Sequence, residues 1–184
     1  VSIFATLVGA NLFVGLNNGY IDYDHRIHNF RASVLILSSF VFLIFSGMII
    51  LFRFILGLYV PLFMTVFALV HAYAFFVVNY YINLLNMENR YREKTALFIL
   101  PNMLQVVFSV IFMIFCNKEY ELQARIAGST GGVFICAAFS YFSIIRGEKN
   151  FLNKEFWKYS LGISVPSILS SVSYMLMQNC DNIM

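Results

Sequence analysis

The sequence contains few charged residues. Aspartate, glutamate, lysine and arginine make up 11% of its 184 residues, against about 25% in an ordinary soluble domain. Proline and cysteine are scarce as well, with three of each, and the cysteines form no CxxC pair or metal-binding spacing. The net charge of +3 gives no reason to expect a nucleic-acid partner. This composition argues against a soluble domain, a cysteine-based metal site and a nucleic-acid-binding module.

Long uncharged runs are the main feature of the sequence. Six runs of at least 20 residues contain no Asp, Glu, Lys or Arg, and 60% of all residues are hydrophobic. A helix needs about 20 apolar residues to cross a hydrocarbon core about 30 Å thick, and in lipid its backbone amides must be satisfied within the helix. The sequence therefore predicts an all-α polytopic membrane protein with six transmembrane helices. The uncharged runs are 1–21, 32–52, 54–87, 95–117, 126–145 and 159–180.

The third run is longer than one span requires. It contains Gly57 and Pro61 near its start, and these residue types favour turns and helix beginnings. We therefore expect a short turn over 53–60 and a helix from about Pro61 to Leu85, which is long enough to span with some tilt.

The end of the first run carries turn-forming residues and then a charged loop. The Asn-Asn-Gly sequence at 17–19 predicts that the first helix ends there, because Asn and Gly adopt left-handed conformations at low cost. Two aspartates and two histidines follow, a combination that can form a metal or acid–base site. Nothing else in the chain supplies a fixed partner, so we expect an ordinary charged loop with no metal or cofactor. These residues are Asp22, Asp24, His25 and His28.

The basic residues indicate how the helices are oriented. Nine of the twelve lie in the loops after the first, third and fifth runs. The positive-inside rule places these loops in the cytoplasm and makes the first helix run inward. An inward first helix is an unusual start, so we expect at least one earlier helix in a longer protein. The nine residues are Arg26, Arg31, Arg90, Arg92, Lys94, Arg146, Lys149, Lys154 and Lys158.

Aromatic residues gather at two of the predicted cytoplasmic edges. Aromatic side chains with an amphipathic ring are enriched where a membrane meets water. We interpret each group as part of an interfacial belt. The first group is Tyr20, Tyr23 and Phe30, and the second is Phe156, Trp157 and Tyr159.

Two ionisable residues fall at membrane depth, where such a side chain costs a few kcal/mol and is a functional candidate. His71 lies ten residues after Pro61, about 15 Å along the helix and near the bilayer midplane. It either carries a proton or binds a substrate, or it is a neutral side chain satisfied by one interhelical hydrogen bond. Asp181 lies 23 residues beyond Lys158 and is expected near the outer interface, where its carboxylate reaches water.

A polar stripe leads to Asp181. Its members are spaced three or four residues apart and therefore share one face of a helix. Such a face either lines a hydrated cavity for a hydroxyl-rich ligand or makes hydrogen bonds to neighbouring helices. Pro166 lies within the stripe and is a candidate hinge. The stripe comprises Ser160, Ser164, Ser167, Ser171, Tyr174, Gln178 and Asp181.

The fourth and fifth runs also carry polar or small residues in a regular pattern. Asn102, Gln105 and Ser109 share one helix face and either line the same cavity or bind neighbouring helices. Gly128 and Gly132 form a small-xxx-small pair, which predicts close packing of that helix against another.

Three segments of the chain resemble those of one transporter family. They are L-N-N-G-Y-I at 16–21, F-W-K-Y-S-L at 156–161 and D-N-I-M at 181–184, with Pro166 between the last two. In this order, and with the topology given by the charges, they resemble polysaccharide or O-antigen flippases of the multidrug/oligosaccharidyl-lipid/polysaccharide exporter superfamily. The resemblance covers essentially the whole chain, as the second to seventh helices of a protein of twelve to fourteen.

The resemblance implies a division into two lobes. Residues 1–145 would supply five helices of an N-terminal lobe, 146–158 a basic cytoplasmic link, and 159–184 the first helix of a C-terminal lobe. It also implies that the protein lies in the bacterial cytoplasmic membrane and moves an undecaprenyl-pyrophosphate-linked oligosaccharide between leaflets. The implied mechanism is alternating access, driven by an ion gradient of H+ or Na+.

The implied substrate pathway runs past residues of both lobes. Asp181 stands where such flippases carry an Asp late in the seventh helix, but Asn182 departs from the Asp-Arg pair common there. No Lys or Arg of this chain lies at mid-membrane depth, so contacts to a pyrophosphate are expected from other helices or from protonated His71. The pathway residues are His71, Asn102, Gln105, Ser164, Ser167, Ser171, Gln178 and Asp181.

Two other functions deserve comparison. A multidrug and toxin extrusion pump of the same superfamily would be expected to carry acidic residues deep in the first lobe. The predicted spans at 32–52, 61–85, 95–117 and 126–145 contain none. A membrane polysaccharide polymerase or acyltransferase needs a positioned acid–base pair or a sizeable catalytic loop, and the loops here are short. We therefore expect a flippase and not an enzyme.

Overall fold

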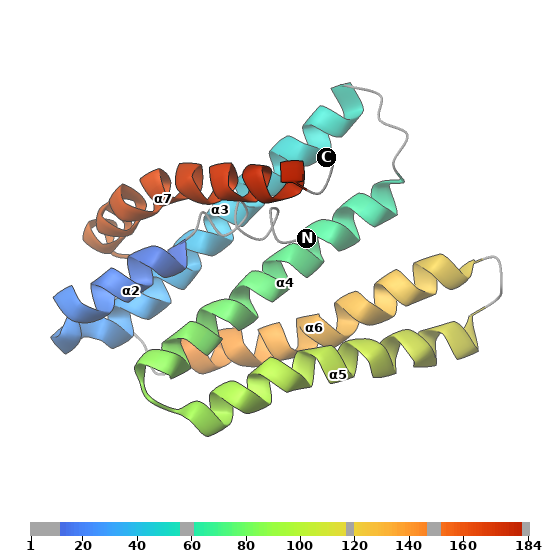
Figure 1. Ribbon diagram of the computed structural model, residues 1–184, viewed down its shortest axis with the longest axis horizontal. Coiled ribbons are helices and arrows are strands. Elements are labelled where there is room, and N and C mark those ends of the chain that lie inside the picture. The colour runs from blue at the N-terminus through green and yellow to red at the C-terminus, as the bar shows by residue number, and fades with distance from the viewer. Residues whose placement is uncertain (1–11, 56–60, 117–119, 147–151, 182–184) are drawn as a thin grey trace. The chain divides into compact units, whose positions relative to one another are not determined.

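The computed structural model describes residues 12–55, 61–116, 120–146 and 152–181. Every regular element over these residues is helical, with six α-helices and one 3₁₀ turn, so the all-α prediction is confirmed. Figure 1 shows them in chain order from blue to red. The elements are α2 (Leu12–Asp22), η1 (Asp24–Arg26), α3 (Ile27–Ile55), α4 (Leu62–Met87), α5 (Tyr91–Phe115), α6 (Glu121–Ile145) and α7 (Lys154–Asp181).

Four of these helices, α3, α4, α5 and α6, are each long and apolar enough to cross a membrane. Many of their large apolar side chains lie on the outside of the structure; Phe98 is 65% exposed and Phe115 is 86% exposed. Water would make so much uncovered apolar surface unfavourable, whereas lipid chains would not. The chain is therefore that of a membrane protein with four helices of spanning length. Spans through α2 and α7 remain a prediction.

The boundary between the second and third predicted spans is partly confirmed. Pro61 directly precedes α4, with an extended ψ of 137°, and α4 ends two residues after the predicted Leu85. The turn predicted over 53–60 is wrong in its first part, because α3 continues to Ile55. Arginine is a good helix former, and no Gly or Pro lies between Arg53 and Gly57, so the helix has no reason to stop at Arg53. Residues 56–60 lie outside the described part.

The predicted helix end at 17–19 is wrong. Helix α2 continues through Gly19 to Asp22, and the Gly19 carbonyl accepts the backbone N–H of Tyr23 at 2.9 Å. A Cβ at position 19 would stand 2.2 Å from a ring carbon of Phe30. The glycine is thus needed for close packing of an aromatic ring and not for a left-handed turn.

The described residues divide into two compact units. The first unit comprises α2, η1, the part of α3 up to Gly47, and the chain from Ile144 onward with α7. Helix α7 lies beside α2 in the opposite direction, because Gly15 is against Ser164 while Asp22, later in α2, is bonded to Tyr159, earlier in α7. The end of α2 and the starts of α3 and α7 therefore meet at one end of this unit (Figure 1). The placement of their loops on the cytoplasmic side of the membrane stays a prediction.

The second unit, Met48–Ser143, is built on α4, α5 and α6. Its α5 and α6 pack with their backbones close together. A Cβ on Gly128 would stand 2.6 Å from the Phe108 carbonyl oxygen, and one on Gly132 would stand 2.7 Å from the Gln105 nitrogen. Ser109 Oγ also donates to the Arg125 carbonyl at 3.3 Å. The predicted role of the small-xxx-small pair in packing is confirmed.

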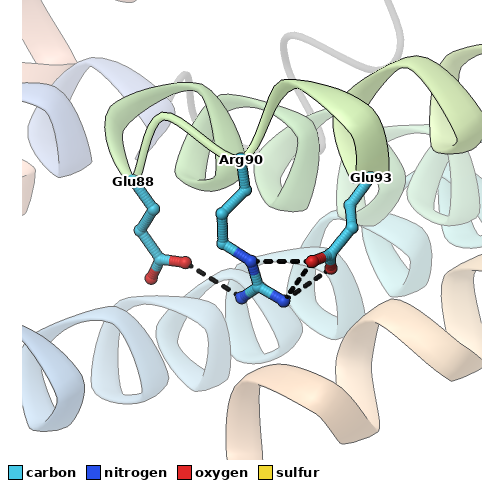
Figure 2. A network of polar contacts seen from close by, with 3 residues as sticks. All are labelled: Glu88, Arg90 and Glu93. Atoms are coloured by element: carbon cyan, nitrogen blue, oxygen red, sulfur yellow. Dashed lines mark hydrogen bonds and ion pairs between the residues drawn. The ribbon is translucent and has the colours of Figure 1, made fainter.

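A rigid turn joins α4 to α5. Asn89 has a left-handed backbone with φ 58°, and the N–H of Arg90 reaches back to the Leu85 carbonyl at 2.9 Å. This is a Schellman motif, which satisfies carbonyls that the end of α4 leaves unpaired. Figure 2 shows the Arg90 guanidinium between two carboxylates, at 2.6 Å from Glu93 and 3.2 Å from Glu88. Hydrogen bonds to Glu93 and then Glu88 raise the pKa of Arg90, so the bridge keeps its charge.

Candidate functional site

The best-defined polar and aromatic site of the first unit is the place where α7 begins. Residues 146–158 are predicted as a link, yet α7 begins at Lys154, so the last five residues of that segment are helical. Asn153 Oδ1 accepts the backbone N–H of Glu155 at 2.9 Å, which is the hydrogen bond of an Asn N-cap. Helix α7 thus begins five residues before the predicted lobe boundary at 159, because the charges at 154–158 do not prevent a helix that is well capped.

Four aromatic rings, from α3, α7 and the loop between α2 and η1, form one cluster at this end. Tyr23 stacks on Phe30 with centroids 5.2 Å apart and meets Phe156 edge-on at 5.0 Å. Tyr159 lies edge-on to Tyr23 at 5.2 Å. Phe30 and Phe156 are completely or almost completely buried. The two aromatic groups interpreted as parts of an interfacial belt are thus packed on each other through these four members, with favourable ring geometries.

Polar contacts surround this aromatic cluster. The Tyr159 hydroxyl donates a short hydrogen bond to the Asp22 carboxylate. Trp157 Nε1 donates to the Ser33 carbonyl at 3.1 Å, and the Asn153 N–H donates to Ser33 Oγ at 3.4 Å. Each contact joins the start of α7 to α2 or α3. We call this set of bonds and rings the aromatic latch.

Burial in the latch changes the acidity of two phenols. Burial first, and then the hydrogen bond to Asp22, raise the pKa of Tyr159 to about 12. Tyr23 lies in the loop between α2 and η1, among the rings just described. Burial first, and then the negative charges of Glu155 and Asp22, raise the pKa of Tyr23 above its usual value of 10. The neutral phenol is the form that suits this position.

Beyond the latch, α7 contacts α2 through small residues. A Cβ on Gly15 would stand 3.1 Å from Ser164 Oγ and 3.2 Å from the Cα of Ser160. Both serines are fully buried, and neither hydroxyl has a hydrogen-bond partner among the described residues. A buried polar group without a partner costs about 1 to 3 kcal/mol. The α2–α7 contact is therefore close in space but polar and unsatisfied on the α7 side.

Ser160 and Ser164 are the only two members of the α7 stripe whose side chains the structure describes as fully buried. Ser167, the next member, is half-buried, and Pro166 is exposed within an uninterrupted helix. Because proline lacks a backbone N–H, the carbonyl of Gly162, four residues before Pro166, receives no hydrogen bond from it within the helix. The backbone of α7 continues through the later members, but the side chains of Ser171, Tyr174, Gln178 and Asp181 lie outside the described part.

The other predicted pathway residues belong to the second unit. His71 is half-buried in the middle of α4. Asn102 is exposed on α5, and its Nδ2 donates to the Phe98 carbonyl of its own helix at 3.0 Å. Gln105 is half-buried, and its backbone lies under Gly132 of α6. The structure thus places these three residues in one unit and Ser164, Pro166 and Ser167 in the other.

In the second unit, the described residues line a hollow towards each end of the α5–α6 pair. The larger has a volume of about 500 Å³ and is lined by Phe63, the end of α5 and the start of α6. The smaller, of about 410 Å³, is lined by Tyr81, Glu93 and apolar residues of α5 and α6. His71, Asn102 and Gln105 do not line either of them.

Sequence reasoning missed the residues that make the α2–α7 contact. Nothing local distinguishes Gly15 and Ser33 from ordinary helix residues, and Asp22 is expected only in an ordinary charged loop. The sequence shows polar and aromatic residues at both predicted cytoplasmic edges, but this pattern does not predict that the two edges are in contact. Asp22 was weighed as part of a metal site, whereas in the structure it accepts the Tyr159 hydrogen bond.

Comparison with known proteins adds no assignment. No family, no curated protein and no solved structure matches this chain. The function must therefore be argued from the residues and contacts of the chain itself.

Proposed function

We propose that the chain belongs to a membrane transporter that moves a lipid-linked oligosaccharide across the bacterial cytoplasmic membrane. One observation carries the proposal: two segments with the flippase resemblance, far apart in sequence, are neighbours in the structure. Gly15 and Asp22 bracket residues 16–21, and they contact Ser160 and Tyr159 of the segment 156–161. Because the segments 16–21 and 156–161 pack against each other, a protein that has one of them is expected to have the other.

The proposed pathway uses the polar face of α7. Ser160 and Ser164 are covered by α2, so the part that lines the passage begins near Ser167 and continues through Ser171, Gln178 and Asp181. Hydroxyl and amide groups can replace the water around sugar hydroxyls with hydrogen bonds of similar strength. Asp181 is the proposed group for a coupling ion, H+ or Na+, since a carboxylate binds either.

His71, Asn102 and Gln105, which belong to the second unit, are the remaining residues of the proposed pathway. A histidine can donate a hydrogen bond, accept one or carry a proton, which suits contact with an oligosaccharide or its pyrophosphate. The long isoprenoid chain of an undecaprenyl-pyrophosphate-linked substrate stays in lipid during transport. The apolar outer surface of the four spanning helices is compatible with a lipid neighbour along the route.

Deletion of the gene tests this proposal. The deletion strain is expected to lose its surface polysaccharide and to accumulate the lipid-linked repeat unit on the cytoplasmic side of the membrane. A plasmid copy should restore both, and a copy with Asp181→Ala and His71→Ala should restore less while inserting normally in the membrane. Normal surface polysaccharide in the deletion strain, with no accumulated lipid-linked unit, would contradict the proposal. Export of cationic drugs by the same strain pair distinguishes the extrusion pump, which predicts a drug-sensitive deletion strain.

A further inference from the structure

We infer that the α2–α7 contact is a gate, which the aromatic latch holds closed and which exposes Ser160 and Ser164 to water when it opens. The inference rests on the proposed function, because an alternating-access transporter needs a contact that forms and separates in each cycle. It adds to that function the position of the moving contact and the residues that hold it.

The unsatisfied hydroxyls are the first argument for a contact that separates. Two fully buried serines elsewhere donate to their own helix: Ser140 to the Cys136 carbonyl at 2.8 Å and Ser38 to the Leu35 carbonyl at 2.6 Å. Ser46 Oγ of α3 is a further buried hydroxyl without a partner among the described residues. Ser160 and Ser164 have no partner among the described residues. Two such groups side by side weaken the closed contact, and separation from α2 would hydrate both of them.

The shape of the contact is the second argument. Gly15 offers no side chain to α7, so the two helices approach closely without interlocking there. Because no large side chain interdigitates at this contact of glycine with serine, the two helices can separate and pack again without a change of side-chain rotamer. Pro166, two residues beyond Ser164, removes one backbone hydrogen bond of α7 and gives the helix a place to bend.

The aromatic latch is the third argument, because it supplies what the serine contact lacks. It lies at the end of α2 and the start of α7, and its Tyr159–Asp22 bond is exposed to solvent. Four rings and a hydrogen bond of a carboxylate stabilise the closed form at this end. The aromatic latch therefore stabilises the closed form, while the buried serine hydroxyls destabilise it. These opposing contributions allow the closed and open forms to be close in free energy.

A reversible crosslink tests whether the contact must open. A Cβ at position 15 would stand 3.1 Å from Ser164 Oγ, so cysteines at 15 and 164 are placed to form a disulfide. We would combine Gly15→Cys and Ser164→Cys with replacement of the native Cys116, Cys136 and Cys180, and assay surface polysaccharide synthesis in the deletion strain. Oxidation is expected to reduce the rate of polysaccharide synthesis more than tenfold, and a reductant should restore that rate.

The matched control for the crosslink uses the opposite side of α7. Gly162 is exposed and has no atom within 4 Å of an added Cβ among the described residues. The pair Gly15→Cys and Gly162→Cys should neither crosslink nor respond to the oxidant. Full synthesis by the 15–164 pair while its disulfide is shown to be intact would overturn the inference and leave the proposed function standing.

A second measurement does not depend on the transported substrate. Ser164→Cys alone, in the background without native cysteines, is labelled in membranes with a water-soluble maleimide. Labelling is expected to be slow, and to become at least fivefold faster when Tyr159→Phe weakens the latch. Such a rise supports the gate even if the deletion strain makes normal polysaccharide and the proposed transport is wrong. Equal labelling rates with and without Tyr159→Phe would overturn the gate, because the latch would then not control access to Ser164.

Discussion

Tyr159 donates its hydroxyl hydrogen to the Asp22 carboxylate, although 137 positions separate the two residues in the sequence. This bond fixes the start of α7 to the end of α2. Around it, the rings of Tyr23 and Phe30 meet Phe156. The stability of the first unit should therefore depend on this small region more than on the long contact of the two helices.

Removal of the Tyr159 hydroxyl should loosen the latch. We expect Tyr159→Phe to lower the free energy of unfolding by about 1 kcal/mol, as the net value of one hydrogen bond is about 0.5 to 1.5 kcal/mol. Trp157 is the only tryptophan and donates to Ser33 in the same region, so its fluorescence reports the loss. Tyr91→Phe, which removes a 3.0 Å bond to Asn89 in the other unit, is the control. Identical Trp157 transitions in both variants would contradict the expectation.

Alkaline pH should loosen the latch through Tyr23. Its pKa is raised by burial and by the carboxylates of Glu155 and Asp22, while Arg26 opposes the shift. A group with a raised pKa in the folded state contributes stability that is fully present below its unfolded pKa and is lost as pH rises through the folded pKa. Stability should thus be constant up to about pH 9 and fall from about pH 10 upward, given the usual tyrosine pKa of about 10.

The pH effect can be measured with the same reporter. Trp157 fluorescence of the detergent-solubilised protein is followed from pH 8 to 11, and the alkaline change should become smaller in Tyr23→Phe, which has no phenol to ionise. The other phenol of the latch, Tyr159, remains in that variant, but burial and the hydrogen bond to Asp22 raise its pKa to about 12, so it stays mostly neutral over this range. A fluorescence change of unaltered size in Tyr23→Phe would show that Tyr23 does not contribute.

The positions of the helices could be predicted from charge alone, because each span must exclude charged residues from lipid. The run 95–117, for example, lies almost entirely within α5. The starts were predicted less well. Helix α5 begins at Tyr91 and α7 at Lys154, since charged residues outside the lipid can still be helical when the backbone is capped. Charge patterns report the depth of a residue and not its backbone conformation.

Contacts between helices could be predicted only where a residue pattern was consistent with a single structural role. Gly128 and Gly132 fit a close helix contact, and the structure has one. Gly19 follows two asparagines, so it resembled a helix end, while its actual neighbour is the Phe30 ring eleven residues later. The contact of Asp22 with Tyr159 depends on how distant helices pack, and neither hydropathy nor charge specifies that.

The α5–α6 contact should be sensitive to a single methyl group. Gly128→Ala and Gly132→Ala would each place a Cβ within 2.6 to 2.7 Å of α5 backbone atoms, which cannot move as a flexible side chain does. We expect each to lower stability by about 1 to 3 kcal/mol, the usual cost of overpacking. Gly131→Ala is the matched control, because no described atom lies within 4 Å of its added Cβ. Thermal unfolding in detergent measures the difference, and a Gly131→Ala loss as large as the others would contradict this account.

The backbone of Asn89 gives the last prediction. Its φ of 58° lies in the left-handed region, where a β-branched residue is strained and glycine is not. Asn89→Val should therefore lower stability by about 1 to 2 kcal/mol, while Asn89→Gly should change it by only a few tenths. Both variants lose the hydrogen bond from Tyr91 to the Asn89 side chain, so the difference between them isolates the backbone effect. Hydrogen exchange at the Arg90 amide, which donates to Leu85, should be faster in Asn89→Val than in Asn89→Gly. Equal exchange in the two variants would mean that the left-handed residue does not hold the turn, and that the ion pairs of Arg90 with Glu88 and Glu93 are sufficient.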